Sequence, residues 1–235
     1  MHLTVNEIPR LIDISAVRTD VQVSEIKLVA EIAVKYNFVC AFAMPCFTGM
    51  LINELKSYDS IMVGGVIGFP SGADTTRIKV ETAKELIALG CSELDMVINV
   101  GELLSGNYDA VYRDIKAVVD TAGGLPVKSI LEISYLNDDE IKTGSKIAAD
   151  AGVSFVKTGT GWAGKPTTVN TIELIREAIG DRALIKAAGG VRSLKDLEAM
   201  YAAGCSRFGI SVTSALKILE EAHKREGLPF NGGIS

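Results

Sequence analysis

The chain has 235 residues, of which 48% are hydrophobic and 23% are charged, and its net charge is −5. This composition is typical of a soluble globular protein with a large core, and its mixed charges contain no basic block of the kind that binds nucleic acid. No apolar run reaches the length of about 18 residues that a membrane-spanning helix needs, so no membrane association is expected.

Histidine and cysteine are scarce, and this narrows the chemistry. The two histidines, His2 and His223, lie near the ends of the chain, so neither a Ser-His-Asp triad nor a histidine-bound catalytic zinc is expected. Three of the four cysteines, Cys40, Cys91 and Cys205, lie in or beside apolar runs, and the spacing of the four fits no zinc motif. Since no signal peptide is visible, a reduced, cytoplasmic protein is the simplest interpretation.

Short β-branched runs alternate with longer helical patterns along the whole chain. The predicted strands are residues 10–15, 38–44, 60–69, 93–99, 127–134, 154–158, 183–187 and 207–210. The predicted helices between them are residues 24–36, 76–89, 109–119, 138–150, 169–179 and 193–202. Eight such units with no break in composition predict an α/β fold, a single (β/α)8 TIM barrel that occupies residues 1–235 as one domain. An open doubly wound sheet is the alternative.

Two lysines stand at the ends of predicted strands, and a loop of small residues follows each of them. Lys157 precedes Thr158 and Gly159, and Lys186 precedes residues 187–190. Neighbouring strands lie about 4.8 Å apart, so the two amines are expected to lie close together. Two adjacent ammonium groups in an interior favour the loss of one proton, and a neutral amine is the nucleophile of Schiff-base chemistry. The structural alternative is a buried ion pair with a carboxylate.

A third charged residue, Asp95, is flanked by apolar residues in its predicted strand. If Asp95 points inward, its carboxylate is expected to balance the lysine charge and to move protons. Taken alone, a buried aspartate is more often a structural hydrogen-bond partner. Lys128 and Glu132 share one alternation phase on the next strand and are expected to extend the charge network.

Glycines and hydroxyl groups gather after the last strands. Gly189 and Gly190 follow the seventh strand, and Ser211 leads from the eighth strand into a helix. Barrels often bind phosphate at this place, through glycine-rich loops and a helix N-terminus. Thr158 and Gly161, after the sixth strand, offer a hydroxyl and close backbone approach to the same ligand. Ordinary turn glycines and an N-cap serine are the structural alternative.

Five segments, in order along the chain, resemble the deoxyribose-phosphate aldolase family. They are residues 67–76 (IGFPSGADTT), 93–101 (ELDMVINVG), 155–161 (FVKTGTG), 186–192 (KAAGGVR) and 208–211 (FGIS). The resemblance extends over nearly the whole chain and is more specific than any single motif. It implies a (β/α)8 barrel and a class I aldolase that reversibly cleaves 2-deoxy-D-ribose 5-phosphate to D-glyceraldehyde 3-phosphate and acetaldehyde.

The resemblance also assigns roles to individual residues. Carried over by position, Lys157 is the Schiff-base lysine, Lys186 lowers its pKa, and Asp95 belongs to the proton relay. Asp13 and Ser15 become substrate contacts beside the strand-end glycines. The resemblance implies no metal and no organic cofactor, and its implied partners are small molecules, a sugar phosphate and aldehydes. The sequence leaves the oligomeric state open, a homo-oligomer included.

The chain departs from the family pattern at the substrate end. Gly159 and Val212 stand where the family usually has serines, Ile14 stands where it has histidine, and the bulky Trp162 lies beside the phosphate-side loop. These departures leave two alternatives, a related class I aldolase acting on a different or unphosphorylated aldehyde, and a non-catalytic barrel that binds sugar phosphates. The glycine-rich tail from about residue 228 is expected to be mobile, and its place relative to the site is open.

Overall fold

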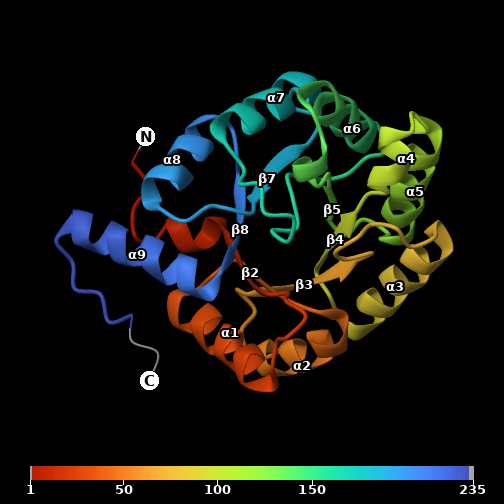
Figure 1. The fold of residues 1–235 in the computed structure, drawn as a ribbon. Coiled ribbons are helices and arrows are strands. Elements are labelled where there is room, and N and C mark those ends of the chain that lie inside the picture. The colour runs from red at the N-terminus through yellow and green to blue at the C-terminus, as the bar shows by residue number, and fades with distance from the viewer. Residues whose placement is uncertain (1, 233–235) are drawn as a thin grey trace.

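The computed structural model describes residues 2–232, which form a closed barrel of parallel strands inside a layer of helices (Figure 1). The strands are β1 (Ile12–Ala16), β2 (Cys40–Ala43), β3 (Met62–Ile67), β4 (Glu93–Val97), β5 (Val127–Ile130), β6 (Phe155–Lys157), β7 (Leu184–Ala188) and β8 (Arg207–Ser211). They pair in chain order, and β8 pairs with β1. The predicted (β/α)8 barrel is therefore confirmed, and the open sheet is excluded.

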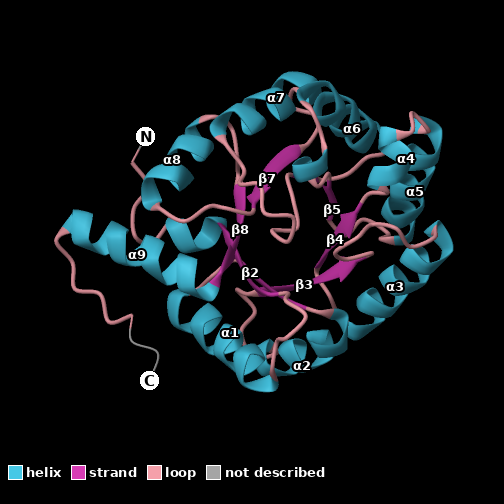
Figure 2. Cartoon of the chain, in the orientation of Figure 1, coloured by secondary structure: helices cyan, strands magenta, loops and turns pink. Residues whose placement is uncertain are grey.

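The helices cover the outside of the barrel, as Figure 2 shows. They are α1 (Val23–Tyr36), α2 (Pro45–Leu55), α3 (Thr76–Leu89), α4 (Val100–Leu104), α5 (Tyr108–Thr121), α6 (Asp138–Asp150), α7 (Val169–Ile179), α8 (Leu194–Ala202) and α9 (Val212–Glu226). Two 3-10 helices, η1 (Ile8–Leu11) and η2 (Ile133–Tyr135), precede β1 and follow β5. None of the helices in residues 2–232 has both the length and the hydrophobicity that crossing a bilayer requires.

Strand β3 shows how glycine lets the barrel close around large side chains. A Cβ atom on Gly64 would lie 2.2 Å from the ring of Phe42, and one on Gly65 would lie 2.7 Å from Leu86. Because neighbouring residues of a strand face opposite sides, Gly64 makes room inside the barrel and Gly65 makes room for helix α3 outside it. Inside the barrel, the ring of Phe42 lies against the charged groups of the interior.

Most strands differ by one or two residues at their ends from the predicted ranges, and the largest differences are two unpredicted helices and the end of strand β5. Helix α2 was not predicted, although Pro45 at its first position and the buried Leu51 and Leu55 fit a helix start and an apolar face. Helix α4 is only five residues long, too short to give a periodic pattern. Strand β5 ends at Ile130, four residues earlier than predicted, because Glu132 adopts a left-handed conformation with φ 56° and the chain turns into η2.

The tail lies on the outside of the barrel as far as residue 232. The ring of Phe230 stacks on Tyr36, with centroids 5.7 Å apart. The carbonyl oxygen of Asn231 accepts hydrogen bonds from Lys35 Nζ at 3.0 Å and from the Tyr36 hydroxyl at 3.3 Å. These contacts hold the tail at the end of α1, on the outer side of the molecule (Figure 1). Residues 233–235 lie outside the described part, and the expected mobility of the tail stays a prediction.

Candidate active site

The interior of the barrel holds a cluster of charged side chains from six strands. This barrel charge cluster consists of Asp13 on β1, Glu93 and Asp95 on β4, Lys128 on β5, Lys157 on β6, Lys186 on β7 and Arg207 on β8. The strand register places Asp95 beside Lys128 and Lys157 beside Lys186. All but Arg207 are buried, so their charges must be matched inside the protein.

Asp95 connects the three lysines of the cluster. Its Oδ2 atom accepts hydrogen bonds from Lys157 Nζ and Lys186 Nζ, both at 2.7 Å. Its Oδ1 atom accepts one from Lys128 Nζ at 3.0 Å. Burial alone raises the pKa of Asp95, but the three lysines together hold that pKa well below its usual range. Asp95 therefore stays ionised and fixes the position of both strand-end amines.

Lys128 and Lys186 have more carboxylate partners than Lys157 has. Lys186 Nζ also lies 2.6 Å from Asp13 Oδ2, and Lys128 pairs with Glu93. Burial lowers the pKa of each of these two lysines, but their carboxylates outweigh it and raise both values above the ordinary range. Lys128 and Lys186 are therefore ammonium ions at neutral pH.

Lys157 behaves in the opposite way. Among the described residues, Asp95 is the single carboxylate within ion-pair distance of its amine. Burial lowers the pKa of Lys157 to about 8, Asp95 opposes this shift, and the neighbouring Lys186 adds to it. The expectation that Lys186 depresses this pKa thus has the right sign, but desolvation is the larger cause.

The charge balance of the cluster explains why one amine is neutralised. With every group ionised, residues 2–232 place four cations (Lys128, Lys157, Lys186, Arg207) against three carboxylates (Asp13, Glu93, Asp95), so 4 − 3 leaves one positive charge in excess. An unmatched charge in an interior is strongly unfavourable. Loss of one proton removes the excess, and Lys157 loses it most readily because it has the fewest carboxylate partners.

Phe42 and Gly209 shape the space around the amines. The Phe42 ring centroid lies 4.4 Å from Lys186 Nζ, 5.2 Å from Lys128 Nζ and 6.0 Å from Lys157 Nζ. The ring face therefore stabilises the charge of Lys186 more than that of Lys157. A Cβ atom on Gly209 would lie 3.3 Å from Lys186 Cε, so glycine at this position gives the lysine its room.

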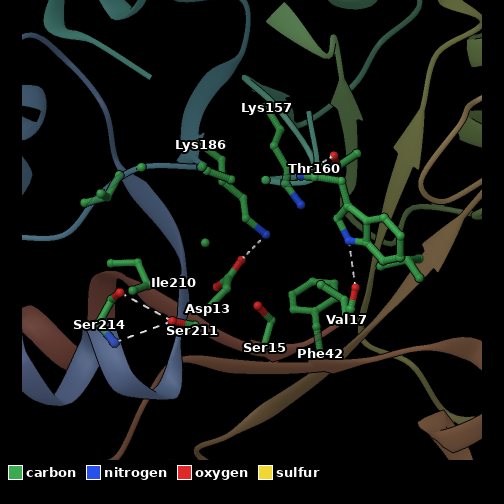
Figure 3. Close-up of a pocket in the computed structure, with 18 of the residues that line it drawn as sticks. Asp13, Ser15, Val17, Phe42, Lys157, Thr160, Lys186, Ile210, Ser211 and Ser214 are labelled. Carbon is green, nitrogen blue, oxygen red and sulfur yellow. Dashed lines mark hydrogen bonds and ion pairs between the residues drawn. The ribbon is translucent and has the colours of Figure 1, made fainter. Parts of the chain in front are cut away.

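A cavity of about 280 Å³ opens above the cluster at the carboxyl ends of the strands (Figure 3). Lys157, Lys186, Asp13 and Ser15 line its floor. One side, here the polar wall, consists of Gly161, Gly189, Gly190, Arg192, Ser211 and Ser214. The other side, here the apolar wall, consists of Val17, Phe42, Val66, Phe69 and Trp162. In Figure 3, Ser211 and Ser214 face Val17 and Phe42 across the cavity.

The polar wall has the features of an anion site. Gly161, Gly189 and Gly190 have φ values of 85°, 88° and 84°, and a Cβ atom on Gly190 would lie 2.4 Å from Pro166. Only glycine adopts these conformations without strain, and it lets a ligand approach the backbone closely. Ser211 is the N-cap of α9 and accepts a hydrogen bond from Ser214 N at 3.5 Å. The positive end of a 15-residue helix thus points at the cavity.

Most of the residues selected from the sequence meet at this cavity. Lys157, Lys186, Asp13, Ser15, Gly161, Gly189, Gly190 and Ser211 line it. Asp95 lies below the two lysines and holds both of them. Asp13 is fully buried and divides its oxygens between Lys186 and Arg207, so the structure places it under the cavity as an ion-pair partner.

Two expected positions differ. The Thr158 hydroxyl lies within 2.7 Å of the Thr167 hydroxyl and donates to the Ala188 carbonyl oxygen at 3.0 Å. It joins the β6 loop to β7 and is not among the residues that line the cavity. Glu132 does not extend the charge network, because the chain turns away after Ile130. Its carboxylate accepts a hydrogen bond from Thr160 N at 3.2 Å.

Glu132 also gives a structural context for Gly159. A Cβ atom on Gly159 would lie 2.9 Å from a carboxylate oxygen of Glu132. The absence of a side chain at Gly159 therefore leaves the space that Glu132 uses to hold Thr160 and the loop after β6. The departure from the family pattern at this position therefore lies beside Glu132 and the Ala188 carbonyl oxygen.

Several functional candidates were missed from the sequence. Glu93 shares the alternation phase of Asp95, and Arg207 shares that of the cavity residue Gly209, so alternation along β4 and β8 was the available signal. Phe42 and Arg192 gave no such signal, because an apolar residue in a strand and a cation in a loop are common.

Two carboxylates of the cluster and the neighbouring Cys40 have a spacing that could hold a metal ion. Ligand atoms of Asp13, Cys40 and Glu93 lie within 4.8 Å of one another. Both carboxylates already pair with lysine or arginine, and burial raises the pKa of the Cys40 thiol well above its usual value. These donors are therefore a poor fit for a metal, because their negative charge is already balanced and the thiol keeps its proton.

Comparisons with known proteins agree with this site. Residues 19–207 match the family model described as DeoC/LacD family aldolase. The deoxyribose-phosphate aldolase of Klebsiella pneumoniae is 40% identical over 94% of this chain and 90% of its own length. The structure of a candidate deoxyribose-phosphate aldolase from Coccidioides immitis has a TM-score of 0.90 at 32% identity, over 95% of this chain and 88% of that one.

A more distant structure has the same architecture. A deoxyribose phosphate aldolase from Aeropyrum pernix, described as tetrameric, has a TM-score of 0.85 at 27% identity and covers 96% of this chain and 94% of that one. The family match includes β2 to β7 and therefore Asp95, Lys157 and Lys186. The chain therefore belongs to the DeoC/LacD family of aldolases.

Proposed function

We propose that this protein is a class I aldolase that reversibly cleaves 2-deoxy-D-ribose 5-phosphate to D-glyceraldehyde 3-phosphate and acetaldehyde, with Lys157 as the Schiff-base residue. The observation that carries the proposal is the lowered pKa of Lys157, about 8, at the floor of an open cavity. At pH 7 about a tenth of such an amine is neutral, roughly 300-fold more than for an ordinary lysine. The other two cluster lysines stay charged and cannot compete as nucleophiles.

The first step follows from the contacts of Lys157. The neutral amine attacks the C1 carbonyl of the open-chain sugar and forms a carbinolamine. Lys186, whose pKa is raised, is the ammonium group that can donate a proton, through water, to the departing hydroxyl. Water leaves and a cationic iminium forms beside Asp95, which already lies 2.7 Å from the nitrogen. The ionised Asp95 stabilises the new cation without needing to reorganise.

The second step uses the iminium as an electron sink. The proton of the C3 hydroxyl leaves to water, the C2–C3 bond breaks, and its electron pair moves into the iminium to form an enamine. Glyceraldehyde 3-phosphate departs along the polar wall. Protonation of the enamine carbon and hydrolysis of the imine then release acetaldehyde and restore the amine. Synthesis runs through the same enamine in reverse.

The polar wall supports the phosphate half of the proposal. The backbone N–H groups of the loops at Gly161, Gly189 and Gly190, the Ser211 hydroxyl and the start of α9 converge on one side of the cavity. Val212 removes one hydroxyl from the family pattern but keeps its backbone N–H at the helix start. Arg192 lines the same wall and supplies a positive charge.

Reductive trapping tests the proposal directly. The protein is incubated with acetaldehyde and borohydride, and the modified peptide is identified by mass spectrometry. We expect one ethyl group on Lys157 and none in the Lys157→Met variant. A different modified lysine, or none, contradicts the proposal. Comparing turnover of 2-deoxyribose 5-phosphate with that of 2-deoxyribose then tests the polar wall, and we expect a clear preference for the phosphate ester.

The oligomeric state and the cellular location of the protein are also part of the proposal. The tetramer described for the Aeropyrum pernix aldolase favours a homo-oligomer for this chain. Light scattering coupled to gel filtration measures this, and a monomer at micromolar concentration contradicts it. A cytoplasmic location stays a prediction from the cysteine pattern and the expected small-molecule substrates.

A further inference from the structure

Trp162 lines the cavity and is the single tryptophan of the chain. It lies in the loop between β6 and α7, and 43% of its surface is exposed. Its indole Nε1 donates a hydrogen bond of 2.9 Å to the carbonyl oxygen of Val17, drawn as a dashed line in Figure 3. Its ring meets Phe69 edge to face, at a centroid distance of 6.0 Å and an angle of 86°.

These two contacts fix the indole between loops that follow three different strands. Val17 follows β1, Phe69 follows β3, and Trp162 follows β6. At its base, the Trp162 backbone N–H donates to the Thr160 hydroxyl at 3.0 Å, and Glu132 holds Thr160 in turn. A ring held at its polar edge, its face and its backbone is a rigid boundary of the cavity, since moving it breaks several contacts together.

The indole edge bonded to Val17 lies across the cavity from Ser211 and Ser214 (Figure 3). A phosphorylated acceptor aldehyde that binds along Ser211 and Gly189 leaves the apolar wall to the other reactant. That reactant is the donor carbonyl compound, which is joined to Lys157 as an imine. Lys157 Nζ lies 6.0 Å from the centroid of Phe42, a member of the apolar wall. A substituent on the donor therefore has the space between Phe42, Phe69 and Trp162 available to it.

We propose that Trp162 is the specificity-determining residue that limits the donor aldehyde to a short alkyl chain. The inference rests on the proposed function and adds the donor class to it. A donor aldehyde condenses with the Lys157 amine, loses one water, and gives up an α-proton to water to form the enamine that attacks the acceptor carbonyl. Acetaldehyde fits beside the indole. Each further methylene of the donor extends toward the indole of Trp162. The protein therefore accepts small apolar donors and discriminates against longer ones.

Donor competition measures this limit. The wild-type protein and the Trp162→Ala, Trp162→Leu and Trp162→Phe variants are assayed in the aldol direction. Glyceraldehyde 3-phosphate is kept saturating, and acetaldehyde, propanal and butanal are the donors. The quantity compared is the ratio of kcat/KM for butanal to that for acetaldehyde. We expect this ratio to rise at least tenfold in Trp162→Ala, less in Trp162→Leu, and least in Trp162→Phe, which keeps an aromatic boundary.

Two further measurements separate the boundary from a general loss of structure. Tyr108→Ala removes an aromatic ring of similar exposure, 47%, from α5, outside the residues that line the cavity, and we expect an unchanged ratio. Borohydride trapping on Lys157 with each donor measures imine formation without any acceptor. It should show the same order of variants, and it remains readable in a variant whose turnover is weak.

The outcomes distinguish this inference from the proposed function. An unchanged ratio in Trp162→Ala and Trp162→Leu, with normal acetaldehyde adducts, overturns the boundary and leaves the aldolase mechanism intact. A ratio that falls in these variants also overturns it, because the indole then attracts longer donors. If wild-type protein forms no adduct with acetaldehyde at Lys157, both the proposed function and the donor limit are wrong.

Discussion

Buried lysines occur in two places in this barrel, and their surroundings give them different chemistry. Lys79 on α3 has no exposed surface, donates to Asp114 Oδ2 at 2.6 Å and to the Val97 carbonyl oxygen at 2.9 Å, and Asp114 also accepts from Thr76. One cation thus meets one carboxylate, and protein groups surround both. Lys157 belongs to a cluster with one cation in excess and lies at the floor of a cavity.

The comparison shows that residue type and burial do not by themselves make a lysine reactive. Both lysines are buried, and both contact an aspartate at hydrogen-bond distance. The difference lies in the charge balance and in access. The Lys79–Asp114 pair is balanced in charge and enclosed by protein groups, whereas an excess cation beside an opening can lose a proton and meet an electrophile there.

The largest expected effect comes from removing the reactive amine. Lys157→Met should lower kcat for 2-deoxyribose 5-phosphate by at least about 10⁴-fold, because the covalent route disappears. It should not destabilise the fold, since it removes the excess charge of the cluster. Steady-state kinetics and urea unfolding of the same preparation measure both quantities. Residual activity within tenfold of wild type is incompatible with a Schiff base on Lys157.

Lys79→Met should have the opposite profile. It leaves Asp114 buried without its cation, and breaking a buried pair in this way typically destabilises a protein by about 3–5 kcal/mol. We expect the free energy of unfolding in urea to fall by that amount and kcat of the remaining folded enzyme to stay near wild type. The double variant Lys79→Met/Asp114→Leu removes both charges and should recover much of the loss. A catalytic defect in the folded variant would show that the Lys79–Asp114 pair and the barrel charge cluster are not independent.

Lys186→Met tests how the cluster controls its reactive member. Lys186 lowers the pKa of Lys157, so its removal should raise that pKa and move the acid limb of the pH profile of kcat/KM to higher pH. Loss of the proton donor should also reduce kcat by about 10²-fold. Lys186→Arg keeps the charge and should keep the acid limb near its wild-type position. If both variants shift the limb equally, charge at this position is not the cause.

The sequence predicted the reactive lysine and its partners in the barrel interior, but it did not predict the buried pair of Lys79 and Asp114. Lys157 and Lys186 could be selected because each ends a predicted strand and precedes a loop of small residues, and Asp95 because it is a charged residue flanked by apolar ones in its strand. Lys79 lies on a helix, where a lysine every few residues usually faces water, and nothing local shows that Asp114 faces it across the α3–α5 contact. Pairing between distant segments requires the fold.

The errors within the site have a related cause. Glu132 was placed by extending strand alternation beyond the last residue of its strand, and Thr158 was placed by the hydroxyl that it offers beside Lys157. Strand β5 ends at Ile130, and the positive φ of Glu132 turns its side chain toward Thr160. Strand β6 ends at Lys157, and the Thr158 hydroxyl contacts Thr167 in its own loop and Ala188 on β7. Alternation is reliable only while the ladder continues, and the sequence marks the end of a ladder poorly.

The smallest expected effect is a change in the free energy of unfolding with pH. It reports on Lys157 and needs no substrate. The folded-state pKa of Lys157 is about 8, below its ordinary value of 10.5. Between these values the unfolded chain binds one more proton than the folded chain at this site, so the free energy of unfolding rises with pH. Over the whole interval the rise is about 3 kcal/mol. Lys128 and Lys186 have raised values and contribute only above that interval.

Urea unfolding at pH 7.5 and at pH 10 measures this rise, and the variants isolate its source. Lys157→Met has no amine to titrate, so its free energy of unfolding should rise less than that of wild type by about 2–3 kcal/mol. Surface groups titrate in both proteins and cancel in the difference. Equal rises for wild type and Lys157→Met would show that Lys157 releases no proton on folding in this pH interval, and the excess charge of the barrel charge cluster would then not explain its reactivity.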